Sequence, residues 1–278
     1  MYLKFLLDTM KIESPNSPTA KKNKVLYLFL KGEEMRSEEN IVMAKLYLEK
    51  ARELGAGVAD QFVKAGILES LGFCYSSGAE YEKALKTTND AIAAFKRLPG
   101  ERGQLGQGNC LVSVGTIFRS LGKYEEAMPY YENGLEILLR LRNKNPLEVD
   151  YETMLGNAYG NMGEFHNEIK KHEQAIELCQ EALKIFKKTG NKLEEARALH
   201  NTGIAYTGMG NFKQSIEYCE KSAHIFKDIG NKQGLFDSYQ VLANNYRYIG
   251  KIDISKRYFE SCIANDIHRD MKQLTDLA

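Results

Sequence analysis

One pattern recurs six times along the chain and constrains its fold more than any other feature. A glycine or alanine is followed three residues later by a large side chain, and twelve and nineteen residues later by small residues. The residues that start the pattern are Gly32, Gly72, Gly115, Gly163, Gly203 and Ala243. They are separated by 40, 43, 48, 40 and 40 residues. A repeat of this length is typical of a solenoid, in which each repeat buries its apolar face against its neighbours.

Each repeat predicts a pair of helices. Residues 194–209 carry apolar side chains at helical spacing, and residues 212–229 do so again. Gly210-Asn211 and Gly230-Asn231 stand where these helices should stop, because both residue types tolerate the left-handed conformation. Gly203 lies inside the first helix, where glycine costs about 1 kcal/mol relative to alanine. Its recurrence in step with the small residues of the second helix predicts a close helix crossing and an all-α solenoid of about six helical hairpins.

Eight short segments of the chain resemble the tetratricopeptide repeat. The first-helix signature is matched by LGFCY (71–75), VGTIF (114–118), TGIAY (202–206) and LANNY (242–246). The second-helix signature is matched by EYEKA (80–84), KYEEA (123–127), KHEQA (171–175) and NFKQS (211–215). The repeat length resembles the longer-repeat subclass of the G-protein-signalling polarity adaptors, kinesin light chains and Rap-type regulators.

The resemblance covers residues 25–265 and implies a right-handed superhelical solenoid. Its repeats are expected at about 25–54, 62–98, 105–142, 150–189, 193–229 and 233–265. In the fourth repeat, LGNAY (155–159) and MGEFH (162–166) compete for the first-helix position, and only the second leaves the right distance to KHEQA. We expect residues 1–24 to form a helix and a connector, with residues 13–24 flexible. Residues 266–278 are expected to begin a further helix, which is either a cap or part of a longer protein.

Composition excludes several classes of function. The formal net charge of +1 argues against general electrostatic binding to nucleic acid or to an anionic membrane. No apolar run approaches the roughly 20 residues of a membrane-spanning helix. The five cysteines form neither a CxxC pair nor a zinc-ligand spacing, so buried free thiols and a cytoplasmic location are expected. They are Cys74, Cys110, Cys179, Cys219 and Cys262.

An enzymatic function is not predicted. The chain contains no phosphate-binding glycine loop, no HExxH and no GxSxG. His268-Arg269-Asp270 matches three letters of a kinase catalytic loop, but the other kinase elements are missing. His166 and His172 fall on different predicted helices, and His166 occupies the place of a packed aromatic side chain. No catalytic residue, metal ligand or cofactor is therefore predicted.

The resemblance implies that the first helices line a concave groove. The groove-facing places lie six and three residues before the repeated glycine and one, four and five residues after it. Those proposed to bind are Arg36, Phe73, Asn109, Arg119, Asn157, Asn167, Arg197, His200, Gln240, Asn244, Arg247 and Tyr248, with the acidic Glu69, Glu164 and Asp237 beside them. Arginine can grip a carboxylate with two hydrogen bonds, and asparagine can bond both polar groups of a peptide backbone. The groove is therefore predicted to bind an extended protein segment that carries acidic residues.

Three interpretations of the function follow. The first is a non-catalytic adaptor or scaffold, and the second is a peptide-sensing regulator of the Rap type. Only about 24 residues precede the first repeat, which is too few for the helical effector module of such a regulator. The third is the repeat or sensor domain of a larger multidomain protein. Chaperone C-terminal carboxylates are disfavoured as ligands, because Phe29, Glu33, Glu69 and Phe73 replace the lysines and asparagines that bind them. Exposed apolar ends also predict end-to-end self-association.

Overall fold

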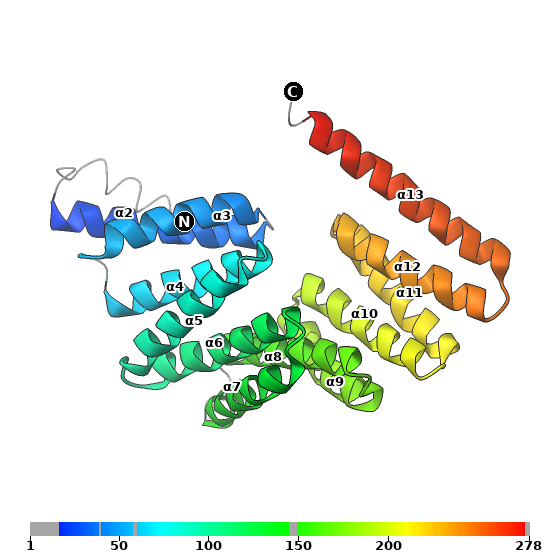
Figure 1. The fold of residues 1–278 in the computed structure, drawn as a ribbon, viewed down its shortest axis with the longest axis horizontal. Coiled ribbons are helices and arrows are strands. Elements are labelled where there is room, and N and C mark those ends of the chain that lie inside the picture. The colour runs from blue at the N-terminus through cyan, green and yellow to red at the C-terminus, as the bar shows by residue number, and fades with distance from the viewer. Residues whose placement is uncertain (1–16, 39, 58–59, 145–148, 276–278) are drawn as a thin grey trace. The chain divides into compact units, whose positions relative to one another are not determined.

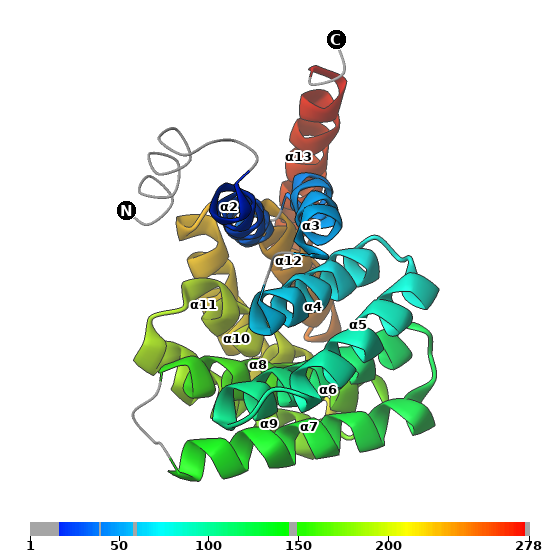
Figure 2. The same ribbon diagram turned by 90° about the vertical axis from the view of Figure 1, so that its left-hand side faces the viewer.

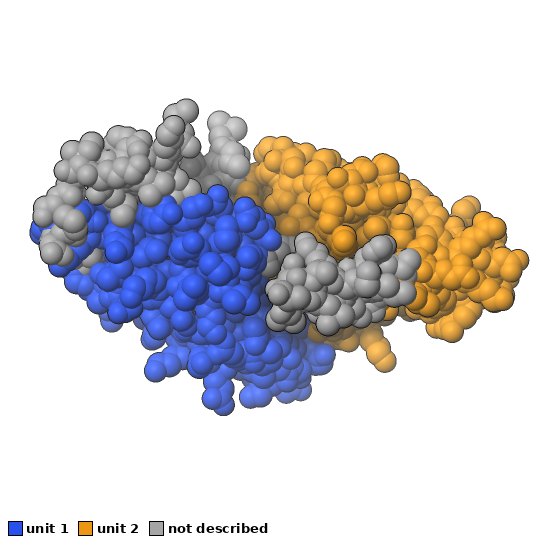
Figure 3. All heavy atoms as spheres, turned by 90° about the horizontal axis from the view of Figure 1, so that it is seen from above, with its two compact units in different colours: residues 1–144 blue, residues 145–278 orange. Residues whose placement is uncertain are grey.

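The computed structural model describes residues 17–38, 40–57, 60–144 and 149–275, and every regular element in those ranges is a helix. The chain divides into two compact units, unit 1 with residues 1–144 and unit 2 with residues 145–278 (Figure 3). Unit 1 contains α2 (Pro18–Ser37), α3 (Ile41–Gly55), α4 (Gln61–Ser77), α5 (Tyr81–Lys96), α6 (Glu101–Ser120) and α7 (Tyr124–Lys144). Unit 2 contains α8 (Val149–Glu168), α9 (His172–Thr189), α10 (Lys192–Gly208), α11 (Phe212–Asp228), α12 (Lys232–Tyr248) and α13 (Ile252–Thr275). The all-α fold class is confirmed.

Consecutive helices pair as antiparallel hairpins: α2–α3, α4–α5 and α6–α7 in unit 1, and α8–α9, α10–α11 and α12–α13 in unit 2 (Figures 1 and 2). Within each unit, the first helices of successive hairpins also pack against one another, as α2 does against α4 and α8 against α10. Among the described residues, a second helix does not approach the second helix of the next hairpin in its unit in this way. The first helices therefore form a tighter, inner layer of each unit, and the second helices form the outer layer.

Glycine and asparagine separate the helices of unit 2, but with different roles. Gly190, Gly210 and Gly230 have φ angles of 72°, 75° and 73°, the left-handed conformation that ends a helix. Asn211 has a φ of −88° and its side chain accepts a hydrogen bond from the backbone nitrogen of Gln214 at 3.3 Å. Asn231 caps α12 in the same way. The expectation that asparagine helps to end the preceding helix is corrected. Glycine ends that helix, and asparagine caps the start of the next one, where its side chain accepts a hydrogen bond from an otherwise unpaired backbone N–H.

The repeated glycines lie where the two helices of a hairpin cross. A Cβ atom at Gly163 would overlap the sulfur of Cys179, and one at Gly203 would overlap the sulfur of Cys219. The equivalent contact of Gly32 is with Leu48, whose Cγ would lie 2.6 Å from such an atom. Each partner stands sixteen residues after its glycine. These contacts confirm the predicted close crossing and the register that starts at Gly163.

Aromatic pairs stack at a second repeated position, three and fifteen residues after the small residue. Phe118 and Tyr130, Tyr206 and Tyr218, and Tyr246 and Tyr258 stack with ring centroids 5.4, 5.4 and 5.7 Å apart. In the α8–α9 hairpin the equivalent residues are His166 and Leu178, and both line an open cavity of about 530 Å³. The His166 ring is buried, with Nδ1 2.8 Å from the Met162 carbonyl oxygen. It is packed, as its place in the repeat predicts.

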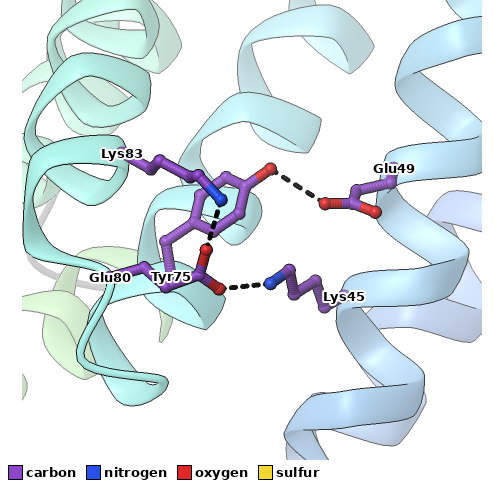
Figure 4. A network of polar contacts seen from close by, with 5 residues as sticks. All are labelled: Lys45, Glu49, Tyr75, Glu80 and Lys83. Carbon is purple, nitrogen blue, oxygen red and sulfur yellow. Dashed lines mark hydrogen bonds and ion pairs between the residues drawn. The ribbon is translucent and has the colours of Figure 1, made fainter.

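Tyrosine–carboxylate contacts connect one hairpin to the preceding one in each unit. The Tyr75 hydroxyl of α4 donates to Glu49 Oε1 of α3 at 2.9 Å. Tyr246 of α12, at the same place in its repeat, donates to Glu220 Oε1 of α11 at 2.8 Å. Figure 4 shows the network around the first pair, formed by Lys45, Glu49, Tyr75, Glu80 and Lys83. The same tyrosine–carboxylate contact therefore joins neighbouring hairpins in both units.

Two expectations at the ends of the chain are corrected. The connector expected over residues 13–24 is helical from Pro18 onward, because Ser17 accepts a hydrogen bond from the Ala20 nitrogen at 3.0 Å and proline is well tolerated at a first helical position. The helix expected to begin near residue 266 does not start there, because α13 continues unbroken to Thr275 and contains no glycine or proline that would stop it. The helix predicted within residues 1–12 lies outside the described residues.

Candidate binding surface

The structure places every proposed binding residue on a first helix, in the inner layer of its unit. In unit 1 these are Arg36 on α2, Phe73 on α4, and Asn109 and Arg119 on α6. In unit 2 they are Asn157 and Asn167 on α8, Arg197 and His200 on α10, and Gln240, Asn244, Arg247 and Tyr248 on α12. Each is half-buried or exposed. The inner layer therefore presents them at its surface.

The guanidinium of Arg36 is held on two sides. Its Nη2 donates to Glu33 Oε2 at 2.7 Å, one turn earlier on α2. Its Cζ lies 5.1 Å from the centroid of the Phe73 ring, a distance at which a cation is attracted to an aromatic face. Within the described residues, Glu33 Oε1 and Arg36 Nε are buried and have no hydrogen-bond partner. Arg36 is thus already paired with a carboxylate of its own helix.

Glu69 completes this cluster from α4. Asn109 Nδ2 of α6 donates a hydrogen bond to Glu69 Oε1. Burial raises the pKa of Glu69 to about 7. The hydrogen bond from Asn109 opposes this shift, the charge of Glu33 adds to it, and the charge of Arg36 opposes it. The carboxyl group of Glu69 therefore changes charge near neutral pH.

Three of the arginines occupy one place in three hairpins. Arg36, Arg119 and Arg247 each lie in the last turn of a first helix, where a cation interacts favourably with the helix dipole. Their surroundings differ. The Cζ of Arg247 lies 5.6 Å from the ring centroid of Tyr248, its neighbour in sequence. Helix-end electrostatics thus accounts for arginine at this place, and the aromatic partner varies between hairpins.

In unit 2, the half-buried His200 lies at one end of a short chain of polar side chains. Its Nδ1 lies 3.4 Å from Ser238 Oγ, which lies 3.3 Å from Ser222 Oγ. Ser222 in turn donates to the Ala196 carbonyl oxygen at 2.8 Å. Burial lowers the pKa of His200, while the charges of Asp237 and Glu164 raise it. Because the lowering dominates, the imidazole is neutral at pH 7.

Three other proposed residues of unit 2 also contact neighbouring groups. Asn167 Nδ2 donates to the Asn201 carbonyl oxygen of the next inner helix at 2.8 Å. Arg197 Nη1 donates to Glu194 Oε1 at 2.6 Å, within α10. The Tyr248 ring is 59% exposed and stacks on Phe212 with centroids 4.9 Å apart. The end of α12 therefore offers an aromatic face beside Arg247.

The contacts of these side chains were not predicted, and two of them show what the sequence could have revealed. Glu33 pairs with Arg36, and the spacing of three residues on a helix is a signal that could have revealed it. Ser238 approaches His200 from 38 residues away, and a small buried serine has no sequence signal that distinguishes it from a core residue. Sequence spacing thus reveals partners on the same helix but not those on the next hairpin.

Other kinds of site find no support in the part of the chain that the structure describes. There, no three His, Cys, Asp or Glu side chains gather as the ligands of a metal ion would. None of the described helices is both long and apolar enough to cross a membrane. All five cysteines are free and buried.

Comparison with known proteins supports the repeat assignment. Family models of the tetratricopeptide repeat match residues 109–137 and 154–228. Protein kinesin light chain-related 3 of Arabidopsis thaliana is 25% identical over 183 residues, which are 66% of this chain and 26% of that protein. Protein kinesin light chain-related 2 of the same organism is 24% identical over 144 residues, which are 51% of this chain and 21% of that protein. The chain therefore spans about a quarter of the length of these relatives.

Solved structures share the fold at low sequence identity. A signal transduction ATPase with numerous domains from Pyrococcus horikoshii, which has a tetratricopeptide repeat sensor, matches with a TM-score of 0.71 and 18% identity over 99% of this chain and 40% of its own. A Rap protein complexed with competence and sporulation factor matches with a TM-score of 0.69 and 15% identity over 95% of this chain and 69% of its own. The repeat pattern, the hairpins and these matches agree: residues 109–137 and 154–228 match the tetratricopeptide repeat, and the chain is similar to kinesin light chain-related proteins and shares its fold with Rap proteins.

Proposed function

We propose that this protein is a non-catalytic adaptor whose inner helices bind an extended segment of a partner protein that carries acidic residues. The observation that carries the proposal is the accessibility of arginine and asparagine side chains in the inner layer of both units. Asparagine can bond the N–H and C=O groups of an extended backbone, and arginine can bond carboxylates. The free, buried cysteines fit a reducing compartment, so we place the adaptor in the cytoplasm.

Two alternatives have specific support. The Rap protein with the same fold was solved with competence and sporulation factor bound, which favours a peptide-sensing regulator. The match to 40% of the Pyrococcus horikoshii protein favours the repeat domain of a larger chain. A regulator is distinguished from an adaptor by its response: peptide binding to a regulator changes its affinity for a second protein.

A displayed library of random peptides tests the proposal. We expect the wild-type chain to enrich peptides rich in Asp and Glu, and the Arg119→Glu, Arg197→Glu, Arg247→Glu variant to bind those peptides about tenfold more weakly or worse. Lys86→Glu, Lys187→Glu, Lys213→Glu is the matched control, since it changes the charge equally on exposed positions of outer helices. Circular dichroism establishes that both variants are folded.

The possible outcomes distinguish binding at the inner helices from binding elsewhere on the chain. Loss of binding in the inner-helix variant alone supports the proposed site. Equal loss in both variants shows a general charge effect, and retention in both places the binding site away from the inner helices. Enrichment of peptides without acidic residues contradicts the acidic preference.

A further inference from the structure

Two successive inner helices of unit 1 bring one cation near two carboxylates. Arg36 and Glu33 come from α2, and Glu69 comes from α4. Arg36 bonds Glu33 directly, and its charge also acts on Glu69. When all three groups are ionised, their summed charge is −1, so the surroundings of Arg36 repel a further carboxylate.

We propose that Glu33 and Glu69 compete with an acidic ligand for Arg36, and so set how strongly unit 1 binds it. This inference rests on the function proposed above. A ligand carboxylate that bonds both Nη atoms of Arg36 must compete with Glu33 for Nη2. It must also approach the charge of Glu69, which Asn109 holds in place from α6. The two glutamates therefore determine specificity without contacting the ligand.

Glu69 makes this competition depend on pH. The charged and titratable groups that interact with it are Glu33 and Arg36 from α2 and Cys110 from α6, whereas Cys74 of its own helix interacts with Arg36 and Glu33 instead. Burial raises the pKa of both thiols, which leaves them neutral near pH 7. Protonation of Glu69 therefore changes the summed charge from −1 to 0, and acidic ligands should bind more tightly below neutral pH than above it.

The test uses a rhodamine-labelled hexaglutamate peptide, with hexaglutamine as the uncharged comparison, in fluorescence anisotropy titrations at about pH 6 and pH 8. The glutamates of the probe stay ionised at both values, since their pKa is about 4.3. We expect Glu33→Gln to bind hexaglutamate about tenfold more tightly, and Arg36→Gln to bind it about tenfold more weakly. Glu69→Gln should tighten binding at pH 8 and remove the difference between the two pH values. Glu82→Gln, an exposed change on outer helix α5, should have no effect.

Each result is decisive. Tighter binding by Glu33→Gln and Glu69→Gln, even where the wild type binds too weakly to measure, supports the competition. Binding that Arg36→Gln weakens but neither glutamate variant tightens overturns the inference and leaves the proposed function standing. Tighter binding by the glutamate variants that does not depend on Arg36 also overturns it. If no variant prefers hexaglutamate to hexaglutamine, the inference and the acidic preference both fall.

Discussion

Asn244 and Asn245 are neighbours on α12 with different surroundings. Asn245 is fully buried; its Nδ2 donates to Ser215 Oγ at 2.6 Å, and its Oδ1 accepts from Thr207 Oγ1 at 3.1 Å. Both partners belong to the preceding hairpin. Asn244 is half-buried on the inner surface. Asn245 therefore stabilises the fold through its contacts, whereas Asn244 is available for a ligand.

This contrast predicts different effects of alanine at the two positions. Asn245→Ala should lower the free energy of unfolding by about 2 kcal/mol, because it leaves a cavity and removes two hydrogen bonds. Asn244→Ala should lower it by less than about 0.5 kcal/mol, as an accessible substitution does, and should weaken peptide binding. Urea denaturation measures both variants. Equal losses of stability would show that Asn244 also belongs to the structural network.

Two of the three glycines of helix α8, Gly160 and Gly163, lie about one turn apart and meet different surroundings. Gly163 lies against Cys179 at the crossing with α9, whereas a Cβ atom at Gly160 would meet no atom within 4 Å. Both residues have ordinary helical backbones, because neither is among the described residues with positive φ. Of these two glycines, only Gly163 has its cost in the helix offset by close packing.

Alanine substitutions separate these two cases within one helix. Gly160→Ala should raise the free energy of unfolding by about 0.5–1 kcal/mol, through the helix propensity of alanine. Gly163→Ala should lower it by about 1–3 kcal/mol, because Cys179 must move to admit the methyl group. Thermal unfolding followed by circular dichroism shows whether each substitution raises or lowers the stability. Stabilisation by both changes would mean that the crossing is looser than the structure indicates.

All five cysteines of the chain share one chemical state. Burial raises the pKa of Cys74 to about 11 and the pKa of Cys179 and Cys219 to about 12, and it raises the pKa of Cys110 and Cys262 as well. The reactive species of a cysteine is its thiolate. Neutral, enclosed thiols should therefore be unreactive throughout the folded chain.

Ellman's reagent tests this expectation at pH 8. The native thiols should react about a hundredfold more slowly than the same five thiols in concentrated guanidinium chloride, where they are exposed and their pKa values are normal. A single thiol that reacts rapidly in the native protein would identify a hairpin that opens locally, and peptide mapping of the labelled cysteine would show which one.

The repeat, the hairpins and the helix crossings could be predicted from the sequence because they depend on local contacts. Gly163 meets Cys179 sixteen residues away, within one hairpin, and the same spacing recurs at Gly203. Hairpins that contact only their neighbours leave the same apolar pattern in every repeat. The prediction erred at the ends of helices, as at Pro18, where one cap determines whether a segment joins a helix.

The partners of the surface side chains could be identified only in the folded chain. The ring under Arg36 belongs to Phe73, the acceptor of Asn109 is Glu69, and the serine beside His200 is Ser238. Each pair joins successive hairpins, so sequence spacing within one helix does not reveal it. An exposed ion pair stabilises a protein by at most about 1 kcal/mol, which is too little to select one partner among several. The packing of neighbouring helices therefore decides which side chains meet.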